Sequence, residues 1–119
     1  MIYSDKIKYD DVPDECSFEP GSSQTLRAAL GLTLGYLTKQ TDGAFIGASA
    51  DLLGSTSINK LNADFPDGFY NSVSNPDSRL IAAGGICEDA MGGLMAGIST
   101  YGKAVGAGSS YGAFITSLQ

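Results

Sequence analysis

Glu88 is the residue with the clearest potential for acid–base chemistry. It follows two glycines, Gly84 and Gly85, and it opens a run of small residues that predicts a helix. A carboxylate at a helix N-terminus gains from the helix dipole and can serve only to stabilise that end, and the neighbouring Asp89 makes this explanation easier. A carboxylate in the same place could also exchange a proton with a bound group. The spacing alone leaves both interpretations open.

A second group of polar residues follows a short apolar run at positions 44–50. Small and polar side chains crowd the end of this predicted strand and include Ser49, Asp51, Ser55, Thr56 and Ser57. An ordinary turn stabilised by Asp51 would explain them. The polar wall of a binding site would explain them equally well.

Three further side chains could contribute to a site. Arg27 lies in a predicted helix, where most arginines only solvate the surface. Tyr111 and Phe114 are three residues apart, a helical spacing at which an aromatic pair usually packs in a core. Each of the three therefore has a structural interpretation beside a functional one.

A face of small residues follows Glu88 along the predicted helix and consists of Gly92, Gly93, Ala96 and Gly97. Glycine in a helix interior costs about 1 kcal/mol relative to alanine, so a compensating contact is expected. The face predicts the close approach of another helix or of another subunit.

The first predicted helix extends from a cap at Ser22 or Ser23 to about Lys39. Leucines at helical spacing predict its buried face: Leu26, Leu30, Leu34 and Leu37. The acidic residues 1–22 before it predict an irregular arm or linker, so the folded domain is expected at 23–119.

Strands and helices alternate along the rest of the chain. The sequence predicts, in order, a strand at 44–50, a loop at 54–79, a strand at 80–83, a helix at about 88–101, a strand at 103–107 and a last helix capped by Ser109 or Ser110. This alternation is typical of the α/β class with a parallel sheet, here an incomplete sheet flanked by helices. Ligands of such sheets sit at the carboxyl ends of the strands, and both Asp51 and Glu88 fall just beyond a predicted strand.

Composition excludes several classes of function. The net charge is −6, so the chain lacks the basic face that nucleic-acid phosphates require. There is no histidine, which excludes Ser-His or Cys-His catalysis and histidine metal ligands within these residues.

No membrane span or secretory signal is expected. Cys16 and Cys87 lack a disulfide framework spacing, which favours a reducing compartment and a cytoplasmic location.

Two motifs in order resemble the pyrimidine-binding domain of the transketolase family. Ser49-Ala50-Asp51-Leu52 resembles the S-A-D-L strand end of that domain. Ile86-Cys87-Glu88-Asp89-Ala90-Met91-Gly92 resembles its I-R-E-H-A-M-G segment, and Gly97-Ile98-Ser99 continues the match. The resemblance covers about residues 18–119 and implies the fold of that domain.

The resemblance implies a thiamine-diphosphate enzyme, dependent on Mg²⁺ or Ca²⁺, that transfers a two-carbon ketol unit between sugar phosphates. It implies that Glu88 hydrogen-bonds N1′ of the aminopyrimidine of the cofactor. It also implies that Tyr111 and Phe114 pack on the pyrimidine and that Asp51 lies near the cofactor and substrate.

An arginine and a serine hold the sugar phosphate in the family, and they match Arg27 and Ser55. The G-D-G…N motif that binds the diphosphate and the metal is absent from these 119 residues. The resemblance therefore implies one part of an active site, which a homo-oligomer or a diphosphate-binding partner domain would complete.

The chain departs from the family pattern beside Glu88, where Cys87 replaces Arg and Asp89 replaces His. These departures leave two alternatives open: a non-catalytic interaction or regulatory remnant of the family, and another thiamine-diphosphate enzyme such as a synthase or dehydrogenase subunit. The S-A-D-L stretch, together with Arg27 and Ser55, favours a transketolase-like enzyme.

Overall fold

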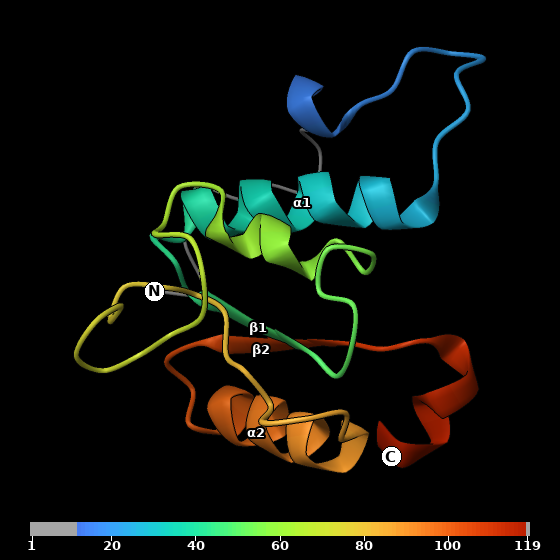
Figure 1. Cartoon of the computed structure of the whole chain (residues 1–119). Helices are drawn as coiled ribbons and strands as arrows, with labels where there is room; N and C mark the ends of the chain where they lie inside the picture. The colour runs from blue at the N-terminus through green and yellow to red at the C-terminus, as the bar shows by residue number, and fades with distance from the viewer. Residues whose placement is uncertain (1–11, 119) are drawn as a thin grey trace.

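Two parallel strands form the centre of the computed structural model, which describes residues 12–118. The strands are β1 (Phe45–Ser49) and β2 (Val105–Ser109), and they pair in register over all five residues. Figure 1 shows that the sheet lies between helices, with α1 (Leu26–Gln40) on one side and α2 (Glu88–Thr100) on the other. The predicted α/β class with a parallel sheet is therefore confirmed.

Thr25 caps α1, because its hydroxyl oxygen accepts a hydrogen bond from the Ala28 backbone N–H at 3.3 Å. The prediction that Ser22 or Ser23 is the cap is therefore wrong, although the predicted helix itself forms. A threonine oxygen at the cap position satisfies a backbone donor that has no partner within the helix.

The buried face of α1 also differs from the leucine pattern. Of the four predicted leucines only Leu34 is buried, and Leu26 is 91% exposed. The face that packs instead holds Gly31, Gly35 and Thr38. A short 3-10 helix, η2 (Ile58–Asn62), packs against this face, and small residues permit its close approach.

A third extended segment lies along the other edge of β1, and within residues 12–118 it pairs with β1 at a single bridge, between Gly47 and Leu80. The Gly47 N–H donates to the Arg79 carbonyl oxygen and the Ile81 N–H donates to the Gly47 carbonyl oxygen, both at 2.8 Å. The predicted strand at 80–83 is therefore reduced to a single point of pairing. Between η2 and this bridge lies the predicted irregular segment, organised around the buried side chain of Asn62.

The chain after α2 is displaced by two residues from the prediction. A turn with Gly102 at φ 79° delays β2, which begins at Val105 rather than at Lys103. Ser109 consequently ends β2 and is not a helix cap. The last element is η3, a 3-10 helix at Gly112–Leu118.

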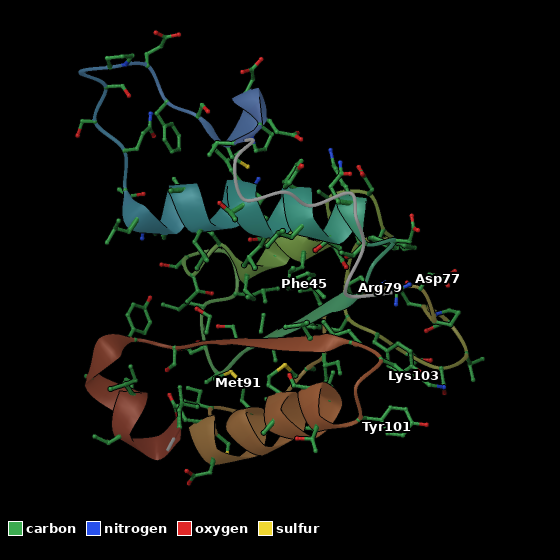
Figure 2. All side chains as sticks on the ribbon, turned by 180° about the vertical axis from the view of Figure 1, so that it is seen from behind. Phe45, Asp77, Arg79, Met91, Tyr101 and Lys103 are labelled. Carbon is green, nitrogen blue, oxygen red and sulfur yellow. The ribbon has the colours of Figure 1, made fainter. Side chains whose placement is uncertain are left out.

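Two apolar clusters cover the two faces of the sheet. On the α1 side the buried cluster consists of Leu34, Ile58, Leu61 and Leu80. On the α2 side it consists of Ala48, Ala50, Met91 and Met95, and Figure 2 shows Met91 between α2 and the sheet. Each helix is thus anchored by its own cluster, which fixes both relative to the strand ends.

The contact between α2 and β2 brings their backbones together. A Cβ at Gly106 would lie 2.7 Å from Met95 Cα, so only glycine fits there. The Gly106 N–H donates to Ser99 Oγ at 2.9 Å, which ties the strand to the last turn of α2. Nowhere in residues 12–118 is a helix long and apolar enough to cross a membrane.

Candidate functional site

Parallel β–α–β topology brings the start of α2 to the carboxyl end of β2. Because α2 runs back along the sheet before β2 begins, its first residue, Glu88, lies near the residues that follow Ser109. The Ser110 hydroxyl donates a hydrogen bond to Glu88 Oε1 at 2.8 Å. Both side chains are half-buried, so the Glu88 carboxylate is held by Ser110 and is only partly exposed to solvent.

Glu88 is not the N-cap of α2. The cap position belongs to Cys87, whose side chain forms no capping hydrogen bond. Glu88 occupies the first turn, where its charge is favourable in the field of the helix dipole, and its side chain turns to Ser110. Asp89, the neighbouring acid, is exposed.

Arg27, Ser55 and Tyr111 form a second cluster at the same end of the sheet. Arg27 Nη1 lies 3.5 Å from both the carbonyl oxygen and the hydroxyl oxygen of Ser55. The Tyr111 hydroxyl donates to Ser55 Oγ at 3.2 Å. These side chains come from α1, from the loop after β1 and from the loop after β2. A guanidinium beside two hydroxyls is suited to an anion such as phosphate.

Ser110 and Tyr111 link the two clusters, since they are consecutive residues directly after β2. Ser110 contacts Glu88, and Tyr111 contacts Ser55. The backbone just before them is held by a hydrogen bond from the Ala50 N–H to the Ser109 carbonyl oxygen at 3.2 Å. One short loop therefore contacts both the Glu88 carboxylate and the Ser55 hydroxyl.

Asp51 forms a local turn at the end of β1. Its Oδ1 accepts a hydrogen bond from the Leu52 N–H at 2.7 Å, and its backbone carbonyl accepts one from the Ser49 hydroxyl. It also lines an open cavity of about 360 Å³ between this turn and the glycine loop at 84–86. Within residues 12–118, no hydrogen bond joins it to Glu88 or Arg27.

Tyr111 and Phe114 are not core residues, because they are 42% and 50% exposed. The expectation from their helical spacing, that the two rings pack in a core, is therefore wrong. Their rings are accessible to a ligand or to a partner at the carboxyl end of the sheet.

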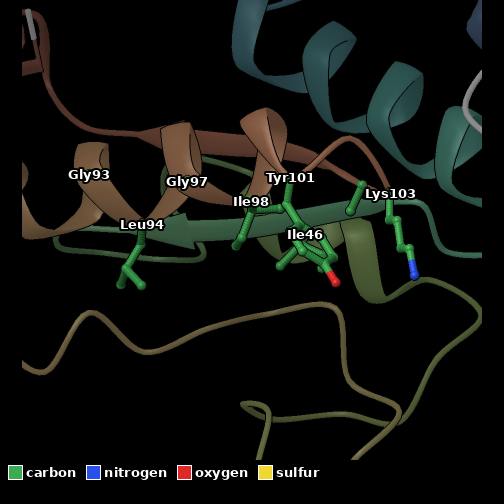
Figure 3. Close-up of a pocket in the computed structure, with 8 residues that line it drawn as sticks. Ile46, Gly93, Leu94, Gly97, Ile98, Tyr101 and Lys103 are labelled. Atoms are coloured by element: carbon green, nitrogen blue, oxygen red, sulfur yellow. The ribbon is translucent and has the colours of Figure 1, made fainter.

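The small-residue face of α2 is used only in part. Gly92 packs against Leu118, whereas a Cβ at Gly93 or Gly97 would meet nothing within 4 Å in the described part of the chain. Gly93 and Gly97 line an open apolar groove of about 630 Å³. Figure 3 shows the side chains of Ile46, Leu94, Ile98 and Tyr101 projecting to one side of α2 along this groove.

Sequence reasoning missed Ser110 as a partner of Glu88 and considered it only as a possible helix cap. The order of the elements could have revealed this pair. When a helix runs back along a sheet and a parallel strand follows it, the residue just after that strand lies near the first turn of the helix. The hydroxyl of Tyr111 was missed because its partner, Ser55, is 56 residues away.

Comparison with known proteins gives a match for most of the chain. A family model described as the transketolase pyrimidine-binding domain matches residues 22–119. Neither the curated proteins nor the solved structures include a match to this chain.

Proposed function

The chain belongs to the family of transketolase pyrimidine-binding domains, and from this membership we propose that it forms the pyrimidine side of a transketolase-like active site. The enzyme would transfer a two-carbon ketol unit between sugar phosphates. Domains of this family are parts of thiamine-diphosphate enzymes. The observation that carries the proposal is the Glu88 carboxylate, half-buried at a helix start and engaged by Ser110 at Oε1.

The roles of the residues follow from their chemistry. Thiamine diphosphate, when bound, supplies the carbanion chemistry at C2 of its thiazolium ring. Glu88 would hydrogen-bond N1′ of the aminopyrimidine and hold a proton at that atom. Tyr111 and Phe114 would pack against the pyrimidine ring. Arg27 and Ser55 would donate hydrogen bonds to the sugar phosphate.

The residues at this end of the sheet fit a pyrimidine ring. Glu88 Oε2 takes part in no hydrogen bond within residues 12–118, so it is available to a ring nitrogen. Asp51 borders the neighbouring cavity, where it would lie near the cofactor and the substrate. The diphosphate and the metal ion, Mg²⁺ or Ca²⁺, would be held by a partner domain that carries the G-D-G…N motif.

Replacement of Glu88 tests the proposal in the enzyme assembled with its diphosphate-binding partner. Glu88→Gln keeps the size of the side chain but removes its acid–base function. We expect the rate of C2 hydrogen–deuterium exchange in bound cofactor to fall by about 10²- to 10⁴-fold. Asp89→Asn is the matched control, because Asp89 is exposed and has no part in the proposed proton transfer. Unchanged exchange in Glu88→Gln would contradict the proposal.

A non-catalytic interaction domain is the second candidate function. It is favoured by Cys87 and Asp89, which stand where the family pattern has Arg and His and which are both exposed. Such a domain would keep the fold and the surface of α2 but would not need the Glu88 carboxylate. In that case Glu88→Gln and Asp89→Asn would behave alike in every assay of the assembled complex.

We also propose that the chain self-associates through the groove beside α2. The support is the cost of Gly93 and Gly97 within a helix, which no contact in residues 12–118 offsets. Leu94 and Tyr101 beside them are 43% and 75% exposed, and burying such side chains stabilises an interface. A second copy would place two glycine-containing helices face to face.

A further inference from the structure

We propose that Ser110 is a positioning residue that directs one oxygen of the Glu88 carboxylate toward the ligand. This inference rests on the proposed role of Glu88. The Ser110 hydroxyl occupies Oε1 as a donor at 2.8 Å. With the Ser110 hydroxyl on Oε1, Oε2 is the oxygen without a hydrogen bond in residues 12–118, so it is the one open to a bound ring nitrogen. Ser110 selects which oxygen exchanges a proton with a bound ring nitrogen.

Within residues 12–118 no other hydrogen bond fixes the Glu88 side chain. Glu88 is only half-buried, and a glutamate has several rotatable bonds whose ordering costs conformational entropy. The N-cap residue Cys87 provides no side-chain hydrogen bond at this helix end. Without Ser110 the Glu88 side chain would sample several rotamers, and neither oxygen would be held toward the ligand.

The backbone holds Ser110 where the hydroxyl can reach. Gly106 lies against the backbone of Met95, and a Cβ at Gly108 would lie 3.3 Å from Met91 Cε. These close approaches set the spacing between β2 and the turn of α2 from Met91 to Met95. Ser110 follows that strand directly, so its position relative to Glu88 is fixed by packing rather than by a mobile loop.

Nuclear magnetic resonance of the chain without cofactor tests the positioning directly. Side-chain couplings of ¹³C-labelled glutamate report whether Glu88 occupies one rotamer or several. We expect one rotamer in the parent and in Ser110→Thr, which keeps the hydroxyl, and averaged rotamers in Ser110→Ala. Ser109→Ala is the control, because the Ser109 hydroxyl forms no hydrogen bond within residues 12–118, and it should retain one rotamer. Averaging in the parent, or one rotamer in Ser110→Ala, would overturn the inference.

The assembled enzyme separates this inference from the proposed function. Losing a hydrogen bond to a charged group should slow C2 exchange in Ser110→Ala by about 10- to 100-fold, and Ser110→Thr should restore it. If Glu88→Gln slows exchange but Ser110→Ala does not, the positioning role is wrong and the proposed function stands. If neither variant slows exchange although Ser110→Ala averages the Glu88 rotamers, the proposed function is wrong and the structural positioning stands.

Discussion

The hydroxyl of Tyr111 donates a hydrogen bond to Ser55 Oγ at 3.2 Å and so joins the loop after β2 to the loop after β1. Arg27 Nη1 approaches the same oxygen at 3.5 Å. Because Ser55 Oγ accepts from these donors, its own proton is free to point outward. The cluster therefore places a guanidinium beside an oriented hydroxyl, an arrangement suited to an anion. Tyr111→Phe would remove the donor that orients Ser55.

Tyr111→Phe should weaken binding of the sugar phosphate without weakening binding of the cofactor. The ring that would pack on the pyrimidine remains, whereas the hydrogen bond to Ser55 is lost. A neutral hydrogen bond contributes about 0.5–1.5 kcal/mol, so KM for the sugar phosphate should rise about 2- to 12-fold. Steady-state kinetics of the assembled enzyme give KM, and calorimetric titration gives the Kd of the cofactor.

Tyr70→Phe is the matched control for that experiment. Tyr70 is 50% exposed and lies in the irregular segment before Leu80, so loss of its hydroxyl should leave both constants unchanged. A Tyr111→Phe enzyme with a normal KM and a weaker cofactor Kd would show that the hydroxyl serves the cofactor and not Ser55.

The parts of the fold that the sequence predicted are those with local signals. The strand at 44–50 and the helix at 88–101 form nearly as predicted, because an apolar run bounded by a turn and a helix following two glycines are local features. Parallel topology then brings residues after β1 and β2 to one end of the sheet. That rule was sufficient for Asp51 and Ser55, which follow β1, whereas the strand expected before Glu88 is a single bridge and Glu88 lies instead beside Ser110 at the carboxyl end of β2.

The parts that were not predicted depend on close packing. The leucine pattern of α1 pointed to the wrong face, because η2 approaches so closely that a Cβ at Gly31 would lie 3.0 Å from Lys60 Cγ. Small residues determine that contact, and hydrophobicity alone does not reveal it. The pairs Glu88–Ser110 and Tyr111–Ser55 likewise join residues 22 and 56 positions apart, and no sequence period encodes them.

Gly93→Leu should abolish the proposed self-association. A leucine side chain at this position would project into the groove beside α2, where a Cβ meets nothing within the described chain but would meet the partner helix of a dimer. Sedimentation velocity should show a dimer for the parent and a monomer for the variant. Thr33→Leu, which adds apolar surface to an exposed position of α1, should remain dimeric.

A parent chain that sediments as a monomer would contradict the proposed interface, and so would a Gly93→Leu variant that stays dimeric. Either result would leave the fold unaffected. The stability of the monomer should not fall in Gly93→Leu, because glycine is less favourable than leucine in a helix interior.

Asn62 organises the segment that leads to Glu88. Its side chain is 6% exposed, and its amide donates to the carbonyl oxygens of Pro66 and Gly68 at 2.8 and 3.1 Å. Its Oδ1 accepts from the Arg79 N–H at 2.7 Å. One side chain thus ties η2 to the residues on both sides of the irregular segment and holds Leu80 beside β1.

Asn62→Ala should lower the free energy of unfolding by about 2–4 kcal/mol, because the buried Asn62 side chain would lose its hydrogen bonds to Pro66, Gly68, Ser78 and Arg79, and each contributes about 0.5–1.5 kcal/mol. Asn59→Ala is a matched control on the same 3-10 helix. Asn59 Oδ1 is buried, yet residues 12–118 offer it no hydrogen-bond partner, so its removal breaks no hydrogen bond and, by relieving a desolvation cost of about 1–3 kcal/mol, should not lower the unfolding free energy. Urea denaturation measures both values.

Equal losses in the two variants would mean that the Asn62 side chain contributes only its volume. The segment before Glu88 would then be held by the single bridge between Gly47 and Leu80.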